Sequence, residues 1–100
     1  MPRFTKIWDV DWKGRHIHVE NWWDLLLRTG ERMFVDGSLV AEHVGWLGLG
    51  SDLEAQISDA GTLRTIRAHL GSIDLGLRLG CTVYVDGQAI GGDTGKRFVT

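Results

Sequence analysis

Two histidines and a glutamate alternate along one short stretch of the chain, in the order His16, His18 and Glu20. Alternate residues of a β-strand project from the same face about 7 Å apart, so two imidazoles and a carboxylate could converge on one metal ion. The alternative is a polar strand face exposed to solvent, and the sequence favours this plainer interpretation. We therefore expect no cofactor, and these three residues remain candidate ligands only.

Five tryptophans in 100 residues form the second unusual feature. Trp8 and Trp12 alternate with aspartates and fit the core face of a strand. Adjacent residues of a strand point to opposite faces, so Trp22, Trp23 and Trp46 cannot all be buried easily. These three are candidate contact residues for a ligand cleft or a partner surface. The alternative is that large indoles cover one end of the fold.

Motifs for catalysis are missing from the sequence. It holds no G-x-S-x-G nucleophile motif, and the glycines between Gly45 and Gly50 are followed by no lysine of a phosphate-binding loop. Asp36 and Asp86 each precede a glycine, which is typical of a turn in which the aspartate caps a backbone amide. Cys81 fits a buried, inert thiol. We expect a protein that is not an enzyme.

Composition narrows the class of protein. A chain of 100 residues with 43% hydrophobic residues is expected to form one domain, residues 1–100, with its own core. A net charge of -2 argues against a nucleic-acid surface, and the sequence has no apolar run of the ~20 residues that a membrane span needs. One cysteine permits no intrachain disulfide, which favours a reducing compartment. We expect a soluble, cytoplasmic protein that binds neither nucleic acid nor membrane.

Alternation of apolar and polar residues predicts short strands through most of the chain. The alternation is clear over residues 6–12, 15–20, 31–36, 38–44, 53–58 and 63–70. Every second residue from Leu75 to Val85 is also apolar, which predicts one long strand or two joined strands that end at residue 85. Short turns are expected at Lys13-Gly14, Asp36-Gly37, Asp59-Ala60-Gly61 and Asp86-Gly87. A short strand over residues 88–90 follows the last of these turns.

Four segments are harder to interpret. Residues 21–28 fit either two helical turns or a buried strand, and we favour the strand because Thr29-Gly30 is typical of a hairpin turn into the next strand. Residues 45–52 suggest a loop or a broken strand, and Gly71-Ser72 suggests a break. Residues 91–100 suggest a loosely ordered tail.

The two Val-Asp-Gly segments, within Gly30 to Val44 and Gly80 to Ile90, are the clearest local signal. Their flanks do not repeat, because the first follows two tryptophans and a leucine run and the second follows a glycine-spaced leucine strand. We interpret them as the same turn chemistry used twice, and not as an internal repeat. In total, seven to nine short antiparallel strands predict a β-sandwich or a flattened barrel.

A family resemblance follows from the order of these features. The succession W-D-V, H-x-H-x-E, T-G-E-R-M-F-V-D-G and V-Y-V-D-G, from Trp8 to Gly87, resembles the Fas apoptotic inhibitory molecule family. The resemblance implies a small non-helical β-sandwich and a non-enzymatic protective or interaction role, linked to cell survival and to misfolded protein. Residues 21–27 depart from the family pattern, with Trp22 and Trp23 where the family has small polar turn residues.

The sequence therefore predicts a non-catalytic protein-interaction module, whose partner is another protein or a second copy in a homodimer. The alternative is a domain that binds a metal or small ligand, and could be an enzyme, using His16, His18 and Glu20 beside a tryptophan-lined cleft.

Overall fold

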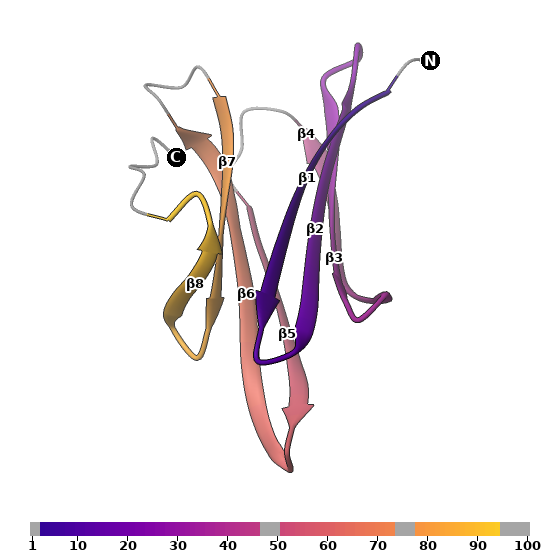
Figure 1. The fold of residues 1–100 in the computed structure, drawn as a ribbon. Helices are drawn as coiled ribbons and strands as arrows, with labels where there is room; N and C mark the ends of the chain where they lie inside the picture. The colour runs from indigo at the N-terminus through magenta and orange to yellow at the C-terminus, as the bar shows by residue number, and fades with distance from the viewer. Residues whose placement is uncertain (1–2, 47–50, 74–77, 95–100) are drawn as a thin grey trace.

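The structure is a computed structural model that describes residues 3–46, 51–73 and 78–94. Eight strands lie in these ranges: β1 (Arg3–Trp12), β2 (Arg15–Asp24), β3 (Arg28–Val35), β4 (Ser38–Trp46), β5 (Ser51–Asp59), β6 (Thr62–Ile73), β7 (Arg78–Val85) and β8 (Gln88–Gly92). They form two antiparallel sheets, β1-β2-β3-β4 and β5-β6-β7-β8, each in chain order (Figure 1). The predicted all-β class and β-sandwich architecture are confirmed.

The core lies between the two sheets, because every second side chain of each strand points toward the opposite sheet. Its members are mostly aliphatic and at most 8% exposed: Trp8, Val10, Ile17, Val19, Met33, Val35, Leu53, Ile57, Ile66, Ala68, Leu70, Cys81, Val83 and Val85. Trp12 is half-buried against this cluster. The expected core positions of Trp8 and Trp12 and the expected burial of Cys81 are confirmed.

Four two-residue turns gather at one end of the sandwich, at residues 13–14, 36–37, 60–61 and 86–87. In each turn both central residues have positive φ, between 47° and 84°, as a type I′ hairpin turn requires. Glycine occupies the second position in all four because it adopts this φ without steric cost. The turns expected at these places are confirmed.

The two Val-Asp-Gly hairpins occupy equivalent places in the two sheets. Asp36 Oδ1 accepts the backbone N–H of His16 at 2.8 Å, and Asp86 Oδ1 accepts the backbone N–H of Thr65 at 2.9 Å. In both cases the arginine one residue before that N–H binds the other carboxylate oxygen. The pairing register also shifts just before each hairpin turn. The shift lies between Met33 and Phe34 in the first sheet and between Val83 and Tyr84 in the second. The two sheets thus share strand order, turn contacts and register shift, which differs from the interpretation of the hairpins as the same turn chemistry without an internal repeat.

These turn carboxylates predict a dependence of stability on pH. The pKa of Asp36 is lowered by the backbone hydrogen bond from His16 and by Arg15, and the pKa of Asp86 by the equivalent groups. A carboxyl whose folded pKa lies below its unfolded value of about 3.8 stabilises the fold above that value, and the contribution is lost as the pH falls through the folded pKa.

We therefore expect a double Asp36→Asn and Asp86→Asn variant to be less stable than the wild type at pH 7 and to lose less stability on acidification. Urea unfolding at pH 7 and at about pH 2.5 measures both differences. Glu54→Gln, at an exposed position of β5, is the matched control. Identical acid losses in wild type and double variant would contradict this account of the turns.

Residues 21–28 follow neither expectation completely. Residues 21–24 complete β2, residues 25–27 turn the chain, and β3 begins at Arg28. The turn expected at Thr29-Gly30 is wrong, because both residues pair within β3. Gly30 is needed there for another reason, since an added Cβ would overlap the indole of Trp22.

Three further boundaries differ from expectation. β6 runs through Gly71, where a break was expected. Of the segment 45–52, expected to be a loop or a broken strand, β4 includes residues 45–46 and β5 includes residues 51–52, and residues 47–50 lie outside the described residues. The loosely ordered tail expected from Gly91 is wrong for its first residues, because β8 includes Gly91 and Gly92 and Asp93 is hydrogen-bonded to β7. Residues 95–100 and the start of the expected long strand at 74–77 lie outside the described ranges.

Candidate functional site

An acid–histidine cluster lies on the outer face of the first sheet: Asp9 and Asp11 on β1, and His16, His18 and Glu20 on β2. The face is outward because the alternate residues of both strands are buried in the core. The two strands pair so that Asp9 lies opposite His18 and Asp11 lies opposite His16. Backbone pairing of two strands therefore sets the spacing of the cluster.

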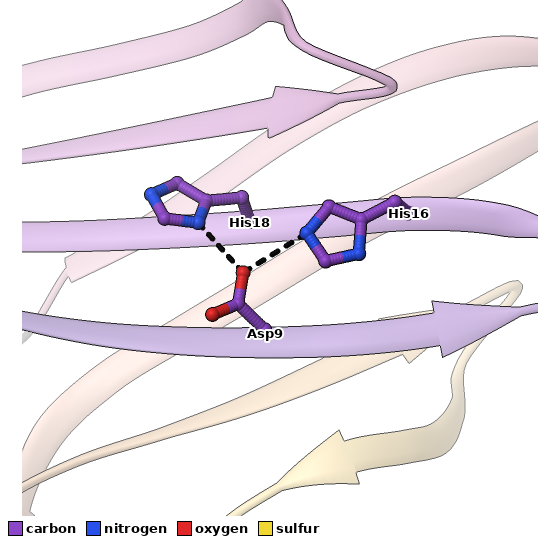
Figure 2. A group of neighbouring side chains, drawn as sticks. All are labelled: Asp9, His16 and His18. Atoms are coloured by element: carbon purple, nitrogen blue, oxygen red, sulfur yellow. Dashed lines mark hydrogen bonds and ion pairs between the residues drawn. The ribbon is translucent and has the colours of Figure 1, made fainter.

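Asp9 joins the two histidines. Its Oδ1 lies 2.7 Å from Nδ1 of His18 and 3.0 Å from Nε2 of His16, so both rings reach the same oxygen atom (Figure 2). The outer nitrogens also have acidic partners: His16 Nδ1 lies 3.0 Å from Asp11 Oδ1, and His18 Nε2 lies 3.1 Å from Glu20 Oε2. Each imidazole is thus held between two carboxylates.

The carboxylates change the proton affinity of the rings. The hydrogen bond to Asp11 is the main cause that raises the pKa of His16. Partial burial opposes a charge on His18, but its hydrogen bonds to Asp9 and Glu20 together outweigh burial and raise the pKa of His18. The hydrogen bond from His18 lowers the pKa of Asp9. The cluster therefore stabilises positive charge between its acidic groups, whether a proton or another cation carries it.

The surroundings of the cluster are open. A shallow depression on this face is lined by His16, His18, Glu20, Phe34 and Gly37. The edge of the His18 ring packs against Phe34, with ring centroids 5.7 Å apart. His16 is 48% exposed at its side chain and His18 is 24% exposed. Such a site suits an ion or a surface contact better than a substrate that must be enclosed.

The three residues that the structure brings together differ from the three candidate metal ligands predicted from the sequence. His16, His18 and Glu20 share one face, but Glu20 lies beyond His18, and Asp9 is the residue that bridges both histidines. A signal for Asp9 is present in the sequence: it alternates with core residues, and the two-residue turn at Lys13-Gly14 places it opposite His18.

The remaining histidines stay apart from the cluster. His43 on β4 pairs with Glu31 on the inner side of the first sheet, and its Nδ1 lies 3.1 Å from Glu31 Oε2. His69 on β6 lies in the other sheet, 3.0 Å from Asp52 through Nδ1.

The three predicted contact tryptophans do not form one surface. Trp22 and Trp23 are adjacent on β2 and point to opposite faces. Trp23 stacks on Phe4 with centroids 5.9 Å apart, and the guanidinium of Arg3 lies 4.1 Å from the Trp22 ring. The side chain of Trp46 lies outside the described residues.

A second candidate surface is the turn between β2 and β3, which we call the leucine tip. It consists of Leu25, Leu26 and Leu27, which are 64%, 56% and 62% exposed. The tip projects at the end of the sandwich opposite the four type I′ turns (Figure 1). The tip was not predicted from the sequence, because a run of leucines is also typical of a buried strand.

Asp24 holds the leucine tip in place. Its side chain is buried, and Oδ1 accepts the backbone N–H of Leu26 at 2.9 Å and of Arg28 at 3.2 Å. Backbone bonds to Asp24 also hold Leu27, which has a positive φ of 65°. A residue with a β-carbon is strained at that φ, so the exposed apolar turn is a specified conformation.

A buried polar network supports the same hairpin from the core side. Asn21 Nδ2 donates to Thr29 Oγ1 at 3.0 Å and to Glu31 Oε1 at 3.1 Å. Thr29 Oγ1 in turn donates to the carbonyl of Trp22 at 2.9 Å. These three hydrogen bonds join β2 to β3 below the tip, although the side-chain oxygen of Asn21 is buried without a hydrogen-bond partner among the described residues.

Comparison with known proteins finds no matching family model, no significantly similar curated protein and no significantly similar solved structure. In the part of the chain that the structure describes, no helix is long and apolar enough to cross a membrane.

Proposed function

We propose that the protein is a non-catalytic protein-interaction module that binds its partner through the leucine tip. The observation that carries the proposal is three consecutive leucines, each more than half exposed, on a turn that a buried carboxylate holds in one conformation. Exposed apolar groups that adjoin one another mark interaction surfaces. A turn that is already ordered loses little conformational entropy on binding.

The rim of the tip indicates the chemistry of the partner. Arg28 follows the tip directly and is half exposed, and Arg3 lies over the Trp22 ring at the base of the same hairpin. Protein interfaces commonly combine an apolar centre with a polar rim in which arginine and tryptophan are frequent. We expect a protein partner with an apolar pocket bordered by acidic side chains.

Two further points support a binding role over catalysis. Burial is the main cause that raises the pKa of the Cys81 thiol to about 12, so the only thiol of the sequence is not a nucleophile near neutral pH. The resemblance to the Fas apoptotic inhibitory molecule family also implies an interaction role, and the tip lies within the segment that departs from the family pattern. A partner specific to this chain is therefore expected.

The test is a triple variant, Leu25→Ser, Leu26→Ser and Leu27→Gly, compared with the wild type as bait in quantitative affinity capture. We expect captured proteins to be depleted at least tenfold, a loss of about 1.4 kcal/mol or more. Glycine at position 27 relieves the positive φ, so thermal stability should be retained.

The control is Leu63→Ser, because Leu63 is 68% exposed but lies on β6. Sedimentation velocity of the wild type shows whether a second copy is the partner, in which case the dimer should be absent in the triple variant. Equal capture by wild type and triple variant, with no self-association in either, would contradict the proposal.

A further inference from the structure

We propose that Asp9, His16 and His18 form a binding site for a divalent transition-metal ion, with zinc as the expected ion. One ligand atom from each residue lies within 4.8 Å of the other two. Two imidazole nitrogens and a carboxylate oxygen are a ligand set that zinc accepts, with an open position for water. The proposal is independent of the leucine tip.

The distances around Asp9 suit such an ion. Zinc holds nitrogen and oxygen ligands at about 2.0–2.2 Å, so tetrahedral ligand atoms lie roughly 3.3 Å from one another. Asp9 Oδ1 lies 2.7 Å from His18 Nδ1 and 3.0 Å from His16 Nε2 (Figure 2). The ion would take the place of the protons shared between these atoms, and the pairs would open by only a few tenths of an ångström.

The strongest support comes from the second nitrogen of each ring. A histidine that binds a metal almost always donates its other N–H to a carboxylate or carbonyl, which fixes the ring and its tautomer. Asp11 takes this place for His16 Nδ1, and Glu20 takes it for His18 Nε2. Both orienting groups are thus in position, and Glu20 acts as an orienting group where the sequence suggested a ligand.

The backbone under the site is fixed. His16 and His18 flank Ile17, which is fully buried, and the N–H of His16 is bound by Asp36. Paired strands hold side chains more precisely than loops do, so little order has to be gained on binding. The cluster also contains three carboxylates for two imidazoles, and a divalent ion offsets their mutual repulsion.

Isothermal titration of the full chain with zinc chloride at pH 7.5, in a buffer that does not chelate zinc, tests the site. We expect one ion per chain, with a dissociation constant tighter than about 100 μM. Asp9→Asn, His16→Gln and His18→Gln should each abolish the 1:1 binding. Glu20→Gln should weaken it by about 10–100-fold, the effect typical of an orienting partner.

The matched control is His69→Gln, which removes an outer-face histidine that also pairs with an aspartate, Asp52, but in the other sheet. It should bind zinc like the wild type, as should the triple variant of the leucine tip. Circular dichroism confirms that each variant is folded. Histidine ring resonances of the wild type provide a readout without any variant, since only those of His16 and His18 should shift with zinc.

Three outcomes would overturn the proposal. The first is wild-type binding weaker than about 100 μM. The second is 1:1 binding that persists in His18→Gln or is lost in His69→Gln. The third is a shift of the histidine resonances of His43 or His69 in place of those of the cluster. A titration with cobalt reports the coordination geometry of the bound ion, because three protein ligands and a water should give the visible absorption of a tetrahedral site.

Discussion

Replacing Gly92 with alanine is expected to lower the free energy of unfolding by about 3 kcal/mol, roughly three times the loss caused by Gly87→Ala. Both glycines have almost the same positive φ, 84° and 83°, so both variants carry the same backbone strain of roughly 1 kcal/mol. The two positions differ in the room available for an added Cβ. A Cβ at Gly87 meets nothing within 4 Å, whereas a Cβ at Gly92 would overlap the carbonyl oxygen of Cys81.

The overlap adds to the loss because backbone cannot move aside as the end of a long side chain can. Overpacking of this kind costs about 1–3 kcal/mol. Displacing Gly92 would also disturb Asp93, whose Oδ2 accepts Trp8 Nε1 at 3.0 Å and the N–H of Cys81 at 2.9 Å. Asp93 thereby links the end of the second sheet to the first strand of the other sheet.

Urea unfolding followed by tryptophan fluorescence measures the difference, with Gly87→Ala as the matched control. Equal midpoints and equal slopes for the two variants would show that Gly92 is not held against β7. In that case the sequence-based expectation of a loose tail from Gly91 would be correct.

The second large effect is expected in the core, at one position of each sheet. Ile17 and Ile66 are fully buried and occupy equivalent places, each opposite the valine of a Val-Asp-Gly hairpin. Truncating either to alanine should lower the free energy of unfolding by about 2–5 kcal/mol, through lost burial and the cavity left behind. Ile7→Ala, at a half-exposed outer position, should cost well under about 1 kcal/mol.

The tryptophans make Ile66→Ala the decisive variant. All five lie on strands of the first sheet, between residues 8 and 46, so their fluorescence reports that sheet and its contact with the second through Trp8 and Asp93. Far-ultraviolet circular dichroism reports the strands of both sheets. If the sheets unfold as one domain, Ile66→Ala should move both signals together. A fluorescence transition that stays in place while the dichroism signal moves would show two independently stable sheets, and would contradict the prediction of one domain over residues 1–100.

Local chemistry accounts for most of what was predictable. Strand faces follow from alternation, and the type I′ turns follow from glycine at the second turn position, because both signals depend only on neighbouring residues. The shared face of His16 and His18 could be predicted in the same way. Asp9 was within reach too, because the turn at Lys13-Gly14 sets the register of the hairpin.

Features that depend on distant residues could not be predicted in this way. The equivalence of the two sheets is hidden in the sequence because equivalent core positions hold different residues, such as Met33 in one sheet and Val83 in the other. The leucine tip was missed for a local reason: Asp24 makes its turn without any glycine or proline, so the run of leucines has the pattern of a buried strand. A leucine at positive φ persists there only because Asp24 and the chain around it determine the conformation.

The amino-acid sequence by itself therefore determined the strand faces, the four hairpin turns and the side on which the histidines lie. The tertiary structure alone decided that the two sheets pack as equivalent halves and where the last strand ends. The reason is physical: the former depend on the period of the β-strand and on allowed backbone angles. The latter depend on contacts such as that between Trp8 and Asp93, which are 85 residues apart in the chain and meet only when the two sheets pack.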